Sequence, residues 1–245
     1  MIGNLVSWSF AAIIVCLAAA LQGITGFGFA LLSVPLLLLI YDPRTAVGIN
    51  IIISFFSLFV LTLRIRREII RPTVLNLFLG SIFGIPLGAY IFLHFNVQEL
   101  KLMIGIVTSL CSLMLLKGVT IKKATGLLWE RITGSISGFL TGSLGMPGPP
   151  IILFLSNQHL PKERFRATTA AYFTLVYPAS LLLLMCLRAI DIHVALTAIT
   201  LIPFAILGGQ IGCRLFHLIP QAQFQRGVPI LVLCTAIYAI FTSLP

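Results

Sequence analysis

Charged side chains are scarce in this sequence. Asp, Glu, Lys and Arg together make up 9% of the 245 residues, whereas 59% are hydrophobic. Runs of about 18 or more apolar residues, each long enough to cross a bilayer as a helix, recur along the whole length. A soluble domain has no use for so much apolar surface. The composition therefore predicts an all-α, polytopic membrane protein.

Acidic residues are the scarcest charged type, and none falls in the middle of an apolar run. Proton and sodium relays usually use a carboxylate within the membrane, so this absence argues against a tightly ion-coupled pump. An anion exporter needs no such carboxylate, because an inside-negative potential drives each negative charge outward with about 2.3 kcal/mol per 100 mV. The six acidic residues lie at the ends of apolar runs or in connectors: Asp42, Glu68, Glu99, Glu130, Glu163 and Asp191.

The sequence also lacks any catalytic or metal-binding pattern. The four histidines lie near the ends of expected membrane crossings and have no paired ligand spacing. The five cysteines stand singly within apolar runs, which favours packing over a disulfide or a metal site. We expect no enzyme activity, no cofactor and no metal.

Basic residues outnumber acidic ones by sixteen to six. In a membrane protein such an excess sets the topology and meets anionic lipid head groups, so we expect the lipid bilayer rather than nucleic acid as a partner. We expect no cleavable signal peptide, because residues 1–4 provide no basic segment before the first apolar run.

Two stretches interrupt long apolar runs where an unbroken membrane helix would be expected. Residues 22–28 contain three glycines, and residues 141–150 end in a Pro-Gly-Pro-Pro run. Both glycine and proline disfavour continuation of a helix. A broken helix at membrane depth is tolerated only where protein buries it or water lines it. We interpret the two breaks as the facing halves of one binding site.

The chain divides into two halves with the same pattern, a broken segment followed by three crossings of about 18 to 24 residues each. Gly26 precedes Gly145 by 119 residues, and Gly84 precedes Gly208 by 124, which points to internal duplication. The first repeat (1–120) comprises a hairpin at 5–41 and crossings at 44–64, 72–94 and 99–117, and the second (121–245) comprises a hairpin at 131–162 and crossings at 166–188, 193–217 and 226–245.

Length and charge both favour re-entrant hairpins over through-going helices at the breaks. The broken segment from Arg131 to Lys162 spans 31 residues, which is about 46 Å as a helix against a hydrocarbon core of about 30 Å. Split at the break, it gives two arms of about half a bilayer, 131–142 and 150–162. With hairpins, thirteen basic residues lie on the cytoplasmic side and three outside, whereas with crossings the split is nine to seven. The positive-inside rule favours the hairpins, and a hairpin plus three crossings requires the repeats to be inverted.

Facing helix breaks suit a small anion, because unpaired N–H groups and partial positive charge gather at a helix N-terminus and glycine allows close approach. The alternative is that the glycines only let helices pack closely, and we prefer it for the evenly spaced Gly80, Gly84 and Gly88, Gly134, Gly138 and Gly142, and Gly208 and Gly212. The expected substrate-binding residues are Gln22, Gly23, Thr25, Gly26, Gly28, Thr141, Gly142, Gly145, Gly148 and Pro149.

Three further polar residues are candidates for gating or for attracting the anion. Arg44 and Arg166 stand at matching places, just before the crossing that follows each hairpin. Interfacial snorkelling is the competing interpretation for both arginines. Asn50 lies six residues beyond Arg44, deeper along the same helix, where a bond to a neighbouring helix is the alternative.

The two breaks resemble the two signatures of the TauE/SafE family of sulfite and organosulfonate exporters. The residues that carry the first resemblance are Gln22-Gly23-Ile24-Thr25-Gly26-Phe27-Gly28-Phe29-Ala30 and Ser33-Val34-Pro35-Leu36. Those that carry the second are Gly138-Phe139-Leu140-Thr141-Gly142-Ser143-Leu144-Gly145, Gly148-Pro149-Pro150 and Phe165-Arg166-Ala167-Thr168.

The resemblance covers nearly the whole chain and implies a small bacterial inner-membrane protein that moves sulfur-containing anions, mostly outward. Met146-Pro147 stands where the family often has more glycine. The family's glycine and proline signatures fall on Gly23, Gly26, Gly28, Gly142, Gly145, Gly148 and Pro149, and its arginine falls on Arg166.

We therefore predict a secondary transporter for a small sulfur oxyanion or sulfonate, working by alternating access in the cell inner membrane. Two alternatives stay open: an anion channel or facilitator for another small anion, and a membrane scaffold or insertion protein. The sequence leaves open which anion is carried, the direction and coupling of transport, and the oligomeric state, a homodimer included.

Overall fold

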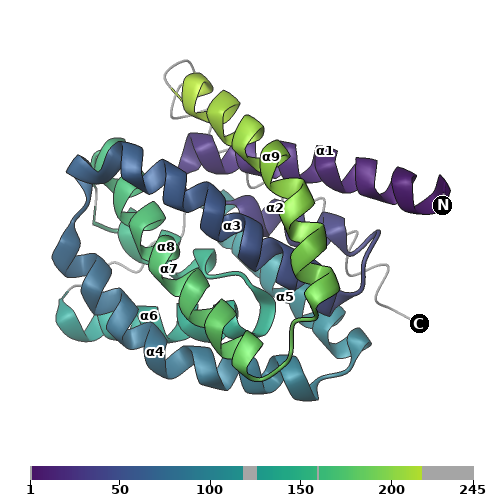
Figure 1. Cartoon of the computed structure of the whole chain (residues 1–245). Helices are drawn as coiled ribbons and strands as arrows, with labels where there is room; N and C mark the ends of the chain where they lie inside the picture. Colours follow the sequence, from purple (N-terminus) through teal and green to yellow (C-terminus); the bar gives the residue numbers. More distant parts are fainter. Residues whose placement is uncertain (1, 118–125, 159, 217–245) are drawn as a thin grey trace.

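A computed structural model describes residues 2–117, 126–158 and 160–216 (Figure 1). Every regular element in these ranges is a helix, as predicted. The elements in chain order are α1 (Ile2–Thr25), α2 (Phe29–Leu37), α3 (Pro43–Ile65), the short 3₁₀ helix η1 (Arg66–Glu68), α4 (Arg71–His94), α5 (Val97–Leu116), α6 (Leu127–Leu144), α7 (Gly148–Ser156), α8 (Lys162–Cys186) and α9 (Ile192–Leu215).

Large apolar side chains cover the outer faces of these helices. On α4, for example, Phe83 is 76% exposed and Leu87 is 64% exposed. Apolar surface on this scale fits lipid rather than water as the solvent. The chain is a multi-pass membrane protein, and five helices in the described residues are long and apolar enough to cross: Val6–Thr25, Pro43–Glu68, Arg71–His94, Lys162–Cys186 and Ile192–Leu215.

Local signals in the sequence set the helix ends. The Asp42 carboxylate accepts the backbone N–H groups of Arg44 at 3.0 Å and Thr45 at 3.2 Å, and Pro43 occupies the first position of α3. The segment expected to cross at 226–245 lies outside the described residues. The other segments expected as crossings, 44–64, 72–94, 99–117, 166–188 and 193–217, are occupied by α3, α4, α5, α8 and α9.

The broken segments have unequal arms. α1 has 24 residues and α2 has 9, while α6 has 18 and α7 has 9. The expectation of two half-bilayer arms at 131–142 and 150–162 is therefore wrong, because α6 alone is about 27 Å long. That expectation placed the arm ends at charged residues, whereas α6 begins directly after Gly126 and α7 stops before the polar pair Asn157-Gln158. Each second arm packs back against its first arm, α2 on α1 and α7 on α6.

Two helix pairs, α4 with α6 and α1 with α9, pack with their backbones almost touching (Figure 1). A Cβ atom at Gly84 would lie 1.9 Å from the carbonyl oxygen of Ser135, and one at Gly208 would lie 2.1 Å from that of Cys16. Side chains essentially never come so close, so only glycine permits the approach. The packing role that we preferred for the evenly spaced glycines is thus confirmed.

These contacts repeat at the spacings that the sequence shows between its halves. Cys16 corresponds to Ser135 at an offset of 119 residues, and Gly84 corresponds to Gly208 at an offset of 124. Cys16 contacts Gly208, and Ser135 likewise contacts Gly84. The same offsets relate the contact between Ala20 and Gly212 to the contact between Phe139 and Gly88.

The helices α3 and α8, which correspond to each other in the two halves, pack side by side and run in opposite directions. Thr62 on α3 is hydrogen-bonded to Thr174 on α8 at 2.9 Å, and the Ile70 N–H donates to Thr168 at 3.2 Å. From Thr62 to Ile70 the residue numbers increase, while those of their partners on α8 decrease from Thr174 to Thr168, so the two segments are antiparallel. Figure 1 shows the pair between α1 and α9 on one side and α4 and α6 on the other.

Candidate functional site

The first break reverses the chain with two glycines in the left-handed region. Gly26 has φ 78° and Gly28 has φ 91°, conformations that side-chain-bearing residues rarely adopt. The Gly26 N–H still closes the last turn of α1 on the carbonyl of Gln22 at 2.7 Å. The Thr25 hydroxyl donates to the Phe27 carbonyl and accepts its N–H, so it is used within the turn itself.

The second break follows the same plan with one glycine. Gly145, at φ 67°, ends α6, and its N–H donates to the Thr141 carbonyl at 2.9 Å. The Ser137 hydroxyl donates to the Pro147 carbonyl at 2.7 Å and so supplies a partner that the broken helix lacks. The Thr141 hydroxyl donates back to the Ser137 carbonyl, also at 2.7 Å, within α6.

Each break is bound by a side chain from the opposite half of the chain. Asn50 on α3 donates from Nδ2 to the Gly145 carbonyl at 2.8 Å, and Arg166 on α8 donates from Nη2 to the Gly23 carbonyl. Both side chains are buried, Asn50 completely and Arg166 with 7% exposed. Because the two breaks are each fixed by the other half, a movement of one half must break or remake these two bonds.

Glycine is required at the breaks for space as well as for backbone angle. A Cβ at Gly26 would lie 2.8 Å from both Cγ and the carbonyl oxygen of Arg166. A Cβ at Gly145 would lie 2.9 Å from Asn50 Nδ2. The residues that bind the breaks therefore sit directly against them.

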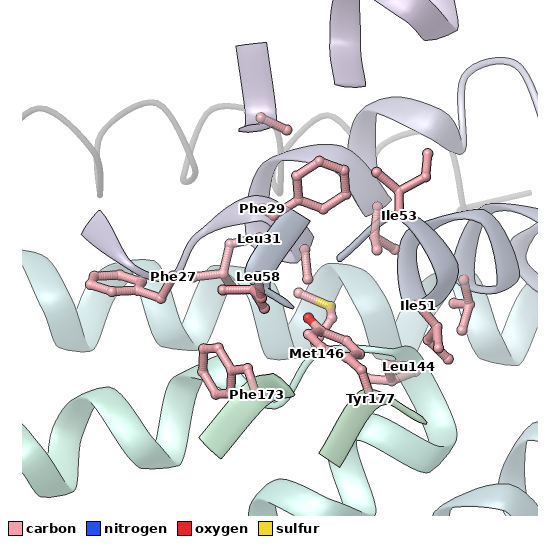
Figure 2. Close-up of a cluster of buried hydrophobic side chains, with 14 of the residues drawn as sticks. Phe27, Phe29, Leu31, Ile51, Ile53, Leu58, Leu144, Met146, Phe173 and Tyr177 are labelled. Carbon is pink, nitrogen blue, oxygen red and sulfur yellow. The ribbon is translucent and has the colours of Figure 1, made fainter. Parts of the chain in front are cut away.

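A small cavity, which we call the break cavity, lies between the two breaks and is lined by residues of both. It is lined by Gln22, residues 27–31, Met146, Gly148, Phe173 and Tyr177. Its volume of about 10 Å³ leaves at most room for one water, so the conformation is closed to an anion. Figure 2 shows Phe27, Phe29 and Leu31 of the first break gathered with Met146 of the second and with Phe173 and Tyr177 of α8.

The polar atoms at this cavity come mainly from the first half. The first three N–H groups of α2, on Phe29, Ala30 and Leu31, have no acceptor within their own helix and lie at its partially positive end. Gln22 is 2% exposed and its Oε1 atom has no hydrogen-bond partner. A side-chain amide has an acceptor oxygen and a donor nitrogen, so Gln22 can bind an anion only through Nε2.

The second break contributes fewer donors than its position suggests. Pro149 and Pro150 are the second and third residues of α7 and have no N–H to offer. Gly148 is therefore the one residue in the first three of α7 that can donate. The two helix starts are therefore unequal, and α2 provides more backbone donors than α7.

The residues that we predicted from the sequence fall into three groups. Gln22, Gly28 and Gly148 line the break cavity, and Thr25, Gly26, Thr141, Gly145 and Pro149 form the turns around it. The third group faces other helices: Gly23 contacts Gly209 on α9, and Gly142 contacts Ile85 on α4.

The two arginines that we expected to act alike are placed differently. Arg44 is exposed and donates from Nη2 to the carbonyls of Leu93 at 3.0 Å and Phe95 at 3.2 Å, where α4 ends. Arg166 instead reaches the first break, lies 3.2 Å from the Cys213 sulfur and stacks 4.3 Å from the centre of the Phe216 ring. Of the two, only Arg166 touches a break.

Sequence reasoning missed Phe173 and Tyr177, which close the break cavity from α8. Tyr177 also donates to the Gly145 carbonyl at 3.4 Å. A signal was present, because tyrosine usually marks the ends of a membrane helix and Tyr177 lies in the middle of one. Within the described residues, no group of three or more His, Cys, Asp or Glu residues could hold a metal.

The chain was compared with protein families, curated proteins and solved structures. No curated protein and no solved structure matches the chain. The family described as sulfite exporter TauE/SafE matches residues 11–239, which includes both breaks and all of the helices from α2 to α9. The chain belongs to the TauE/SafE family of sulfite exporters.

Proposed function

We propose that this protein exports sulfite or a small organosulfonate across the inner membrane of a bacterium, with the anion bound between the two breaks. Membership of the family implies transport of a sulfur-containing anion rather than enzyme activity. The observation that carries the finer proposal is the break cavity, in which the N-terminal end of α2, the Gln22 amide and Gly148 face one another.

The chemistry of this cavity suits a small oxyanion. The free N–H groups of α2 can each donate to one oxygen, and the helix dipole adds partial positive charge at the same place. The surrounding side chains of Phe173 and Tyr177 exclude water, which strengthens each bond to the anion. No carboxylate lies near the cavity to repel the substrate, since all six acidic residues lie at helix ends or in connectors.

Inverted repeats would supply the movement that opens the cavity to either side. The antiparallel α3 and α8 and the repeated offsets between the helix pairs support this arrangement. The bonds from Arg166 to Gly23 and from Asn50 to Gly145 would break in turn, one on each side of the membrane. Because both are formed here, we take the described conformation as a closed state between the two openings.

Sulfite flux into and out of proteoliposomes tests this proposal. Gln22→Leu removes the side-chain amide, whose Nε2 would donate to the anion, and we expect flux to fall by about tenfold or more, as the loss of one good hydrogen bond to a charged ligand predicts. The matched control is Gln210→Leu, which makes the same change on an exposed part of α9 and should leave flux within about twofold. Equal flux from wild type and Gln22→Leu would refute the site.

A further inference from the structure

A second cavity, much larger than the first, opens at the end of the molecule beyond Arg166. We call it the basic vestibule. It has a volume of about 540 Å³, and its walls include four arginines, Arg64, Arg66, Arg67 and Arg166. Arg166 connects the vestibule to the first break, because it lines the vestibule and also donates to the Gly23 carbonyl of that break.

The positive charge of the vestibule is not balanced by carboxylates. The four arginines outnumber the two carboxylates in its walls, Glu68 and Glu163, and Glu68 also lies 3.8 Å from Arg164, which is not part of the lining. The remaining four lie elsewhere: the carboxylates of Asp42 and Glu99 accept backbone N–H groups at helix starts, Glu130 accepts from Asn76, and Asp191 precedes α9. Segments 118–125 and 217–245 contain no Asp or Glu, so the sequence provides no other acidic side chain that could neutralise the site.

Arg166 has one donor, Nε, that no protein group accepts. It is 7% exposed, its Nε has no hydrogen-bond partner, and the ring of Phe216 covers the guanidinium at 4.3 Å. These contacts are all with neutral groups, and a buried cation without an anionic partner is unfavourable. An oxyanion in the vestibule would supply the missing acceptor, and the flat guanidinium fork matches two oxygens of such a group.

We propose that the basic vestibule is a second binding site, specific for the oxyanion group of a small sulfur or phosphorus acid. Arg66 and Arg67 on η1 meet the anion from the open side, and Arg166 meets it from the closed side. Because Arg166 also binds Gly23, the bound oxyanion competes with the Gly23 carbonyl for the same guanidinium. A role as the loading site for export rests on the proposed function, whereas the binding itself does not.

Titration calorimetry with sodium sulfate at constant ionic strength tests the site. Arg66 and Arg67 are exposed, so the double variant Arg66→Gln/Arg67→Gln should fold normally. We expect its sulfate affinity to fall by about tenfold or more. The charge-matched control is Arg71→Gln/Arg131→Gln, which removes two exposed arginines outside the vestibule and should change affinity by less than about twofold. Equal losses from the two double variants would show an effect of overall charge and overturn the proposal.

The same oxyanion chemistry is offered by free sulfate and by a lipid phosphate. We therefore repeat the titration in nanodiscs of phosphatidylcholine with and without phosphatidylglycerol. Unchanged sulfate affinity identifies a soluble anion as the occupant, while competition by phosphatidylglycerol that requires Arg66 and Arg67 identifies a lipid head group. Both results support the site, and absence of sulfate binding in every arm contradicts it.

Failure of this inference can be told apart from failure of the proposed function. If proteoliposomes show no sulfite flux but sulfate binding still depends on Arg66 and Arg67, the vestibule is a binding site and the transport proposal is wrong. If flux depends on Gln22 but sulfate affinity is the same in both double variants, transport stands and the vestibule is not a site.

Discussion

The side-chain amide of Asn50 donates to the backbone carbonyl of Gly145, 95 residues later in the chain, at 2.8 Å. The same amide accepts the hydroxyl of Ser33 at 2.9 Å through its oxygen, so it connects α2, α3 and the second break. One fully buried residue in the first half thus fixes the break of the second half. Arg166 does the reverse for the first break, and these two contacts form the basis of the first predictions.

Loss of the Asn50 amide should destabilise the protein. Asn50→Leu leaves the Gly145 carbonyl with only the Tyr177 hydroxyl at 3.4 Å, a weak bond. We expect a cost of about 1–3 kcal/mol, measured as a lower thermal unfolding temperature in detergent. Ser33→Ala is the control, since it removes one bond to Asn50 but leaves the bond to Gly145 intact. A larger loss for Ser33→Ala than for Asn50→Leu would contradict this account.

Removal of the Arg166 guanidinium should impair transport. The shorter, uncharged side chain in Arg166→Gln cannot both donate to the Gly23 carbonyl and provide positive charge in the vestibule. We therefore expect sulfite flux to fall by about tenfold or more. Arg164→Gln, two residues away, breaks an exposed ion pair with Glu68 and should have almost no effect. Arg166→Lys keeps the charge without the planar fork, and its flux should lie between that of wild type and that of Arg166→Gln. The account fails here if Arg164→Gln and Arg166→Gln behave alike.

Three glycines with positive φ should differ in their tolerance of alanine. All three substitutions incur backbone strain of about 1–3 kcal/mol, but Gly26→Ala also forces a Cβ to within 2.8 Å of Arg166. Gly28→Ala would meet Leu21 at 3.3 Å, and Gly126→Ala would meet nothing within 4 Å. Thermal unfolding should therefore rank Gly26→Ala as the most destabilising of the three. An equal loss of stability for Gly126→Ala would show that backbone strain alone, and not contact with Arg166, accounts for the need for glycine at position 26.

Neighbouring glycines on α9 give an internal control for helix packing. Gly208→Ala would place a Cβ 2.1 Å from the Cys16 carbonyl and should separate α1 from α9, lowering the unfolding temperature. Gly209→Ala meets its nearest neighbour, Ser57, at 3.7 Å and should stabilise the helix by about 0.5–1 kcal/mol. Opposite signs for two adjacent substitutions are the expected result, and the same sign and size for both would contradict the packing assignment.

Topology can be tested with single cysteines in a cysteine-free variant. Arg164 and Arg188 are both exposed and lie at opposite ends of α8. We expect a membrane-impermeant maleimide added to intact cells to label Arg188→Cys, and to label Arg164→Cys only after the membrane is opened. Labelling of Arg164→Cys in intact cells would place the basic vestibule outside and reverse the proposed direction of loading.

Much of this fold could be predicted from patterns within short stretches of the sequence. Apolar runs and their charged ends gave the helices α3, α4, α5, α8 and α9, because the bilayer fixes the length of a crossing. The breaks could be found from Gly26, Gly28 and Gly145, because left-handed backbone angles leave few alternatives to glycine. The spacing of 119 and 124 residues between the halves reappeared in the contacts of α1 with α9 and of α4 with α6.

The contents of the site were harder to predict, because they depend on contacts between the halves. Sequence position made Arg44 and Arg166 equivalent, but only Arg166 is directed into a break, while Arg44 caps α4. Pattern reasoning also treated the two breaks as equal donors, although Pro149 and Pro150 have no N–H. Phe173 and Tyr177 were missed because aromatic residues in an apolar helix resemble ordinary core residues until α8 is placed against the breaks.

The most direct test of the central claim is to locate a bound substrate analogue. Crystals grown with 2-bromoethanesulfonate, an organosulfonate whose bromine gives an anomalous signal, would show where the anion lies. The account predicts a bromine peak between Gln22, the N-terminal end of α2 and Gly148, in a cavity wider than the closed one described here. If the protein transports this compound but the peak lies only in the vestibule or on the surface, with the space between the breaks still closed, the central claim is contradicted.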